Sequence, residues 1–268
     1  MSGADTMATT AAAAPPITAT ASAQRRVVWL WPGQAAYFGP SFHLDTHSAA
    51  VHTLAFGIDA EFTFTIRQGA VRRLRSVLIP ARTPHRIEGQ GRMLFFYLDA
   101  GSGRIQSVRN AMRDRSTPAP ADHEATAELL AHLTATDRPD PAEIGRIVLG
   151  GRARPPIDHR IRRTMDALLA DPGGAPAASA AAATAGLSES RFLHLFTDQC
   201  GTSYRRYRLW ARLLFVGAAV AEGRDLTAAA ADAGFASASH FSDTFRTLFG
   251  LTATAVLSRG TEIITLAR

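Results

Sequence analysis

The sequence predicts a two-domain α+β protein, with a β-rich N-terminal half and an all-α C-terminal part. Between about residues 25 and 103, β-favouring side chains alternate with period two in several short segments. Between about 155 and 263, apolar residues recur at helical spacing, and several positions repeat after 48 or 49 residues. The length of 268 residues also suits two modest domains, because single hydrophobic cores stop growing near this size.

The composition is that of a globular chain without a membrane span. Hydrophobic residues make up 46% and charged residues 19%, and no run of about 18 apolar residues is free of charges or breakers. Residues 1–24 are rich in Ala, Thr and Pro and predict a disordered tail rather than a signal peptide. Cys200 is the single cysteine, so an intramolecular disulfide is excluded and a cytoplasmic location is favoured.

The net charge is +6, and all 29 residues of the Lys-plus-Arg count are Arg. A basic balance favours polyanionic partners. From Pro155 onward, however, Arg barely outnumbers Asp plus Glu. Charge alone therefore does not identify a region that binds a polyanion.

The first domain is expected over residues 25–103. Strand-like segments lie at 25–30, 61–67, 76–79 and 92–98, separated by Gly and Pro, and predict a small barrel or sandwich. Residues 104–154 turn helical and predict a linker or dimerisation segment. There, Asp140 is suited to cap a helix that has Pro141 at its first position. Gly and Pro residues near 150–156 mark the boundary to the second domain.

An internal repeat organises residues 155–263. Phe192, Phe196 and Gly201 recur 49 residues later as Phe241, Phe245 and Gly250. Ala182 and Gly186 recur 48 residues later as Ala230 and Gly234. The difference of one residue falls in the turn between the helices, where an insertion is tolerated best.

Each repeat has the same physical plan. A short Ala-rich helix, 177–185 or 227–233, ends at a Gly that can adopt the left-handed conformation. Ser188 or Ser237 then caps a second helix, in which Phe residues four apart face inward. This is helix-turn-helix geometry. Two ordinary helical hairpins in an enzyme core are the alternative, but a doubled unit joined by one long helix, 203–222, argues against it.

These residues resemble a known family, the AraC-type transcription regulators. The resemblance lies in 230–235, 239–246 and 249–250, and again in 186–188, 191–192, 195–196, 201, 207–208 and 212–213. It covers about a hundred residues. It implies seven helices, with two recognition helices that enter successive major-groove segments of double-stranded DNA.

The resemblance also implies which residues contact DNA. These are Ser188, Ser190, Leu193, His194, Ser237, Ala238, Ser239, His240, Asp243 and Arg246. The family often has a basic residue where Asp243 stands, and Arg is common at the position of His194. A carboxylate accepts from the cytosine amino group but repels phosphates. Thr252-Ala253 also replaces the usual Pro.

The order of histidines in the first domain resembles the cupin-like sensor barrels that accompany such DNA-binding domains. The resemblance implies an effector pocket that includes His47, Arg82 and His85. A three-histidine metal site of His43, His47 and His85 is the alternative, and imidazole suits several transition metals. The Glu that normally follows the His pair is absent, since no acidic residue follows His47 until Asp59. We therefore predict neither a metal nor another cofactor.

The sequence predicts a sequence-specific, DNA-binding transcription regulator whose first domain senses a small effector or mediates dimerisation. Its expected partners are DNA, a second copy of the chain in a homodimer, and RNA polymerase. A metal-dependent cupin enzyme using the three histidines is one alternative, and a regulator that needs no effector is another. Enzymatic activity is not expected, because the sequence lacks a Gly-rich phosphate loop, a nucleophile elbow and a zinc-protease pair.

Overall fold

The computed structural model describes residues 25–66, 71–98, 100–150, 157–257 and 260–267. The predicted tail, 1–24, and residues 151–156 at the predicted domain boundary lie outside them. The strands are β1 (Arg26–Trp31), β2 (Gln34–Pro40), β3 (Thr53–Gly57), β4 (Phe62–Ile66), β5 (Val71–Leu74), β6 (Ser76–Ile79), β7 (His85–Glu88), β8 (Arg92–Tyr97), β9 (Met112–Asp114), β10 (Ala121–His123) and β11 (Thr261–Thr265).

Helices follow the sheet-forming half of the chain and fill most of its C-terminal part. They are α2 (Ile105–Asn110), α3 (Thr126–Thr134), α4 (Pro141–Leu149), α5 (His159–Ala170), α6 (Ala178–Thr184), α7 (Glu189–Cys200), α8 (Tyr204–Ala221), α9 (Leu226–Asp232), α10 (Ala238–Phe249) and α11 (Ala253–Leu257). Within the described ranges, no helix combines the length and the apolarity that a bilayer crossing requires.

The strands form two sheets rather than a closed barrel. The larger has the order β11-β1-β2-β8-β3-β6-β10-β9, and the smaller has the order β5-β4-β7. The larger sheet has two free edges, so it does not close on itself. The two-domain α+β prediction is thus confirmed, whereas the predicted barrel is not.

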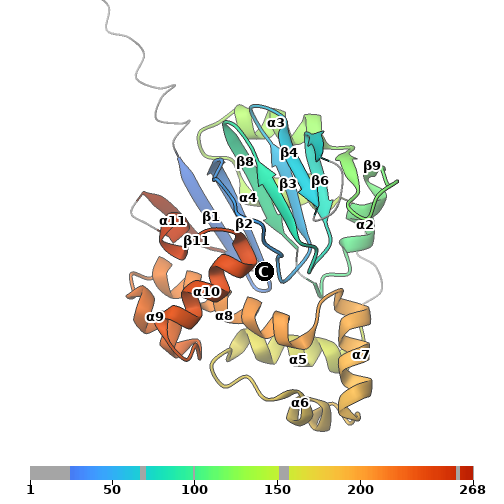
Figure 1. The fold of residues 1–268 in the computed structure, drawn as a ribbon, viewed down its shortest axis with the longest axis vertical. Coiled ribbons are helices and arrows are strands. Elements are labelled where there is room, and N and C mark those ends of the chain that lie inside the picture. Colours follow the sequence, from blue (N-terminus) through green and yellow to red (C-terminus); the bar gives the residue numbers. More distant parts are fainter. Residues whose placement is uncertain (1–24, 67–70, 99, 151–156, 258–259, 268) are drawn as a thin grey trace, which may run out of the picture.

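One face of the larger sheet is covered by α3 and α4 (Figure 1). The buried side chains between them form an apolar core: Trp29, Leu54, Phe96, Leu129, Leu133, Ile144, Ile147 and Val148. Both helices bury one apolar face, as their periodicity predicts. Asp140 caps α4 by accepting from the backbone N–H of Ala142 at 2.9 Å, as predicted.

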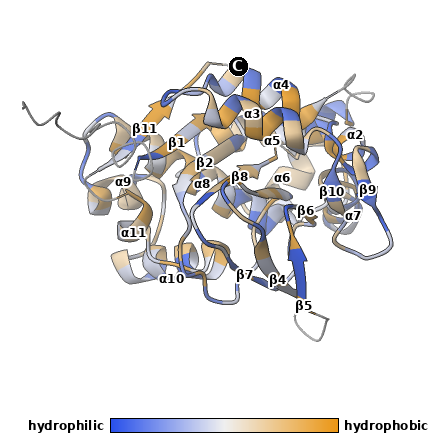
Figure 2. Cartoon of the chain, turned by 90° about the horizontal axis from the view of Figure 1, so that it is seen from above, coloured by the Kyte–Doolittle hydropathy of each residue, from blue (hydrophilic) through white to orange (hydrophobic). Residues whose placement is uncertain are grey.

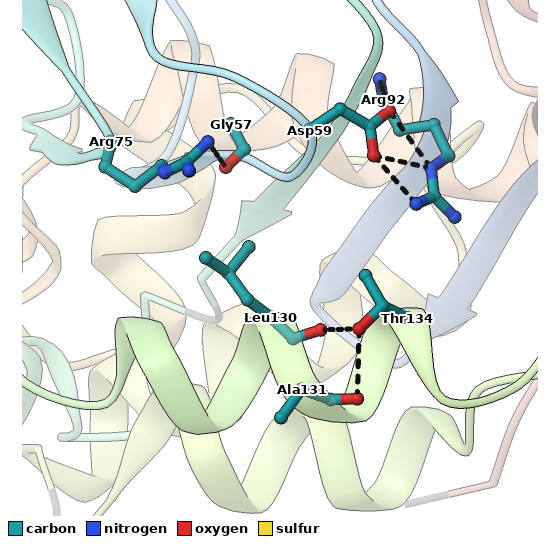
Figure 3. Close-up of polar contacts among 7 residues, drawn as sticks. All are labelled: Gly57, Asp59, Arg75, Arg92, Leu130, Ala131 and Thr134. Atoms are coloured by element: carbon teal, nitrogen blue, oxygen red, sulfur yellow. Dashed lines mark hydrogen bonds and ion pairs between the residues drawn. The ribbon is translucent and has the colours of Figure 1, made fainter.

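An ion pair fastens the turn after β3 to the start of β8 (Figure 3). The guanidinium of Arg92 donates to Asp59 Oδ1 at 2.7 Å, and its backbone N–H donates to Asp59 Oδ2 at 2.7 Å. Nearby, Arg75 donates to the carbonyl of Gly57 at 3.4 Å. Charge-assisted contacts of this kind hold the turn in one geometry. In contrast, β5 is polar and lies at the edge of the molecule (Figure 2).

Three strands were missing from the sequence prediction for the helical regions. β9 and β10 lie within 104–154 and extend the larger sheet through β6, so this segment is not entirely helical. β11 follows the last helix and pairs in parallel with β1, where Val28 faces Ile263. The C-terminal part of the chain therefore ends in the sheet of the first domain.

A second apolar core is continuous across both domains. Trp210 of α8 donates through its indole N–H to the carbonyl of Gly33 at 2.9 Å. Tyr97 of β8 packs against Trp210 with ring centroids 5.6 Å apart and edge-on against Phe249 of α10 at 5.4 Å. Because these packed rings join the two domains, we expect the domains to unfold together rather than independently.

Candidate nucleic-acid interface

The first helix-turn-helix unit consists of α6 and α7. Gly186, with φ of 64°, makes the turn after α6, and Ser188 caps α7 by accepting from the N–H of Arg191 at 3.4 Å. Phe192 and Phe196 are fully buried. These local features match the predicted plan of the unit.

The second unit, α9 and α10, repeats this construction. Asp225 caps α9 by accepting from the N–H of Thr227 at 2.9 Å, and Ser237 caps α10 by accepting from that of His240 at 3.0 Å. Phe241 and Phe245 are buried against the other helices. Both second helices end at a glycine with positive φ, 66° at Gly201 and 75° at Gly250. The sequence repeat is thus a repeat of structure.

The long helix α8 joins the units, as the sequence predicts. Ser203 caps it by accepting from the N–H of Arg206 at 3.4 Å. Tyr204 and Tyr207 are buried on one side, where Phe196 packs edge-on against Tyr204 with ring centroids 5.5 Å apart. The spacing between the two units is therefore set by a buried, aromatic-rich helix.

Nine of the ten predicted DNA-contacting residues are exposed, and Leu193 is half-buried. Two of the nine, Ser188 and Ser237, use their hydroxyl oxygens as caps. His240 lies edge-on to Phe235, with ring centroids 5.5 Å apart, so its ring is partly oriented by the core. On α10, Asp243 and Arg246 line a cleft that they share with residues 45–48 of the first domain. The contacts of all ten residues with DNA remain predictions.

The structure brings two of the predicted effector-pocket residues together. His47 and His85 are buried, with ring centroids 4.3 Å apart, and their backbones form an isolated β-bridge. Nδ1 of His47 lies 2.9 Å from the carbonyl of Asp45, and Nδ1 of His85 lies 2.8 Å from that of Thr83. A carbonyl only accepts, so in both neutral rings the proton sits on Nδ1.

The other candidates from the first domain lie elsewhere. His43 is exposed, and its Nε2 is 3.4 Å from a guanidinium nitrogen of Arg86. Arg82 lines a different groove, beside Arg206 of α8. Among the described residues, no three His, Cys, Asp or Glu side chains gather as metal ligands would. His43, His47 and His85, the ligands of the alternative metal site, do not come together in the described structure.

One segment of the first domain, residues 45–52, touches both second helices. The N–H of Asp45 donates to the carbonyl of Gly250 at 2.8 Å, and that of Ser48 donates to Thr247 at 3.2 Å. His47 lies against Gly250, and His52 lies against Gly201, leaving no room for a side chain at either glycine. The two repeat-related glycines are thus covered by two histidines of one segment, an arrangement that no local sequence signal indicated.

Sequence reasoning also missed two hollows between the domains. An apolar cavity of about 90 Å³ is lined by β1, β2, β8, α8 and α10, including Val28, Tyr37, Phe95, Trp210, Leu213 and Phe249. A polar groove of about 590 Å³ lies along the N-terminal half of α8. A cluster of arginines at 205, 206, 208 and 212 was the available signal for the groove.

The buried histidines predict a loss of stability on acidification. Burial and the neighbouring His47 lower the pKa of His85 to about 3, and burial with nearby Arg109 lowers that of His52 to about 4. In the unfolded chain their pKa is about 6.5. The unfolded state therefore binds more protons below pH 6.5, so stability is fully present above this pH and is lost as the pH falls toward 4. We expect a loss of about 1.4 kcal/mol per pH unit for each histidine.

Urea denaturation at a series of pH values measures this effect. The variant His85→Gln removes one titrating group and should flatten the dependence of the unfolding free energy on pH between 6.5 and 4. Equal slopes in this variant and the wild type would contradict the prediction.

The fold and the repeated units define a double helix-turn-helix domain packed on a sheet-rich domain. Residues 181–259 match the family model described as "Helix-turn-helix domain". The predicted resemblance to AraC-type regulators is confirmed for this C-terminal domain. No protein with a curated description matches the sequence significantly.

Solved structures of ToxT from Vibrio cholerae have a similar fold. An apo single-substitution variant of ToxT has a TM-score of 0.55 and 10% identity, over 84% of this chain and 97% of that one. Wild-type ToxT bound to an unsaturated fatty acid has a TM-score of 0.51 and 10% identity, over 84% and 94%. Another crystal form of ToxT has a TM-score of 0.50 and 11% identity, over 84% of this chain and 97% of that one. At this identity the likeness concerns the fold: a sheet-rich first domain followed by a helical one.

Proposed function

We propose that this chain is a sequence-specific DNA-binding transcription regulator, and not an enzyme, whose first domain responds to a small molecule. The paired helix-turn-helix units carry the proposal. Each buries its phenylalanines and leaves one polar face of its second helix open, as a helix that reads a major groove must. The long buried helix α8 keeps the two faces at one separation.

The residues on the open faces suit base reading more than phosphate binding. On α10, Ser239, His240, Asp243 and Arg246 are all exposed. Serine and histidine offer hydrogen bonds to base edges, and Asp243 can accept from a cytosine amino group. With a single arginine on this face, most phosphate contacts must come from other surfaces.

Segment 45–52 supplies a physical connection between the first domain and both reading helices. It contacts α10 through two backbone hydrogen bonds and covers Gly201 at the end of α7. A change in the position of this segment would alter both helices at once. Such a ligand effect requires unequal binding to the two arrangements of the domains.

The apolar cavity between the domains is our candidate for the effector site. Its volume of about 90 Å³ is below the several hundred Å³ of typical ligand pockets. A larger apolar molecule would fit only if the domains separated, and it would therefore favour a different domain arrangement. The fatty-acid-bound form of ToxT, which shares the fold, supports an apolar effector for this chain.

Binding to DNA from upstream of the gene for this chain tests the proposed function. We expect a site-specific complex whose affinity falls with salt but exceeds that for random DNA by at least about a thousandfold. Equal affinity for specific and random DNA at every salt concentration would refute the proposal.

His240→Ala should weaken recognition of one half-site by about 1–3 kcal/mol, because a base-edge contact is lost. Footprinting of each half-site measures this loss. His132 on α3 is half-buried and lies outside both helix-turn-helix units, so His132→Ala should bind like the wild type and provides the control. An unchanged footprint for His240→Ala would remove this residue from the predicted interface.

The homodimer and the contact with RNA polymerase remain predictions. A regulator without an effector also remains an alternative. It predicts that no apolar ligand changes the DNA affinity, whereas the proposed function predicts such a change for a molecule that enters the cavity.

A further inference from the structure

Arginines from both domains face one groove between α8, α10 and the turn that precedes β7. The groove has a volume of about 590 Å³. Among its described lining residues, the arginines are Arg82, Arg205, Arg206, Arg208 and Arg212. Asp243 is the one carboxylate among these lining residues. This surface is therefore strongly positive.

The charge of these arginines is not neutralised within the described part of the chain. None of the five forms an ion pair with a described residue. Burial, with the charge of Arg82, lowers the pKa of Arg206, and burial, with that of Arg208, lowers that of Arg212. Like charges held together in this way favour a bound anion.

Two of the arginines that line the groove also have an unused hydrogen-bond donor. Nε of Arg206 and Nε of Arg208 are buried and have no hydrogen-bond partner. The remaining guanidinium contacts are to neutral oxygens: Arg206 donates to Ser48 Oγ at 2.8 Å, and Arg208 donates to the carbonyl of Ala175 at 2.9 Å. A buried donor without a partner is unfavourable, so these guanidinium groups gain by turning toward an oxygen of a bound ligand.

The backbone at Arg82 is strained in a way that holds this residue at the groove. Arg82 has φ of 67°, a left-handed conformation that is unfavourable for a non-glycine residue. Its N–H donates to the carbonyl of Ala49 at 3.0 Å, which fixes the turn beside segment 45–52. Strained residues of this kind often occur at ligand sites.

We propose that this groove binds an oxyanion, a phosphate or carboxylate group, between the two domains. The planar guanidinium forks match two oxygens of such a group. The bound anion would contact Arg82 of the first domain and Arg206 and Arg208 of α8. The arginines of the two domains repel each other, and a bound anion between them would attract both. The apolar cavity lies on another face of α8, at Trp210, Leu213 and Gly217, and is a separate site.

The oxyanion has two sources, a free small molecule or the DNA backbone. The groove also borders His240 and Asp243, which are predicted to read DNA. The DNA source rests on the proposed function, whereas the free-anion source does not. Measurements on the full chain, with and without DNA, separate them.

The first measurement is thermal unfolding with inorganic phosphate against sodium chloride at equal ionic strength. For a free-anion site we expect a saturable rise in Tm with phosphate alone. Arg82→Gln should weaken the apparent phosphate affinity at least tenfold. Arg115, exposed beside β9 and outside the groove, provides the control, and Arg115→Gln should behave as the wild type.

The second measurement is the salt dependence of DNA binding in phosphate-free buffer. If DNA supplies the oxyanion, Arg82→Gln should weaken binding to specific and random DNA alike and reduce the logarithmic salt slope by about 1. Either positive result supports the site. The inference is overturned if phosphate acts as chloride does and Arg82→Gln binds DNA as Arg115→Gln does. If the wild-type protein binds specific DNA in that case, the proposed function stands and only the oxyanion site is refuted.

Discussion

Replacing Phe196 with Ala is expected to reduce the free energy of unfolding by about 3–5 kcal/mol. The side chain is fully buried in α7. Its ring lies edge-on to Tyr204 and Tyr207 of α8, with centroids 5.5 and 5.8 Å apart, and also contacts Phe192. Removal of the ring leaves a cavity among rigid aromatic neighbours that cannot collapse to fill it.

Urea denaturation followed by circular dichroism measures this loss. His194 is exposed two residues earlier on the same helix, so His194→Ala should change the stability by less than about 0.5 kcal/mol. Because the core is continuous across the domains, Phe196→Ala should retain a single transition. A loss below about 1 kcal/mol would contradict the assignment of Phe196 to the core.

Gly250→Ala is expected to have the second large effect, because it combines backbone strain with a collision. Gly250 has φ of 75°, and a Cβ would lie 2.5 Å from the carbonyl oxygen of Asp45 and 2.7 Å from His47 Nδ1. The left-handed conformation alone costs a non-glycine residue about 1–2 kcal/mol. The collision with a backbone oxygen adds to this cost, since backbone cannot rotate away as a flexible side chain can.

Gly186 provides a matched control. It also has positive φ, 64°, but nothing lies within 4 Å of an added Cβ. Gly186→Ala should therefore show the strain cost alone. Gly250→Ala should lose at least about 1 kcal/mol more, and segment 45–52 should become more accessible to hydrogen exchange. Equal losses in the two variants would mean that the segment is not packed on α10 in solution.

The helical half of the protein could be predicted closely from its sequence because its signals are local. Ser188 and Ser237 lie directly before the helices that they cap, and inward phenylalanines recur at the spacing of one turn. Capping and periodicity act over a few residues and are therefore visible in the sequence. They identified the buried and open faces of α7 and α10.

The β-rich half was predicted less completely because strand pairing is non-local. β3 is buried along its whole length, so it lacks the alternation that marks a half-exposed strand. β11 pairs with β1 from the other end of the chain, and β9 and β10 join the sheet through β6. Nothing near these segments indicates their partners.

Local signals were sufficient to predict the paired helix-turn-helix units, including their caps, turns and buried phenylalanines. The folded chain was needed to show that His47 and His52 cover Gly250 and Gly201, and that Arg82 faces the arginines of α8. The difference comes from the range over which the forces act. Helical periodicity relates residues three or four apart, whereas these contacts join residues more than a hundred positions apart, brought together by burial of one continuous core.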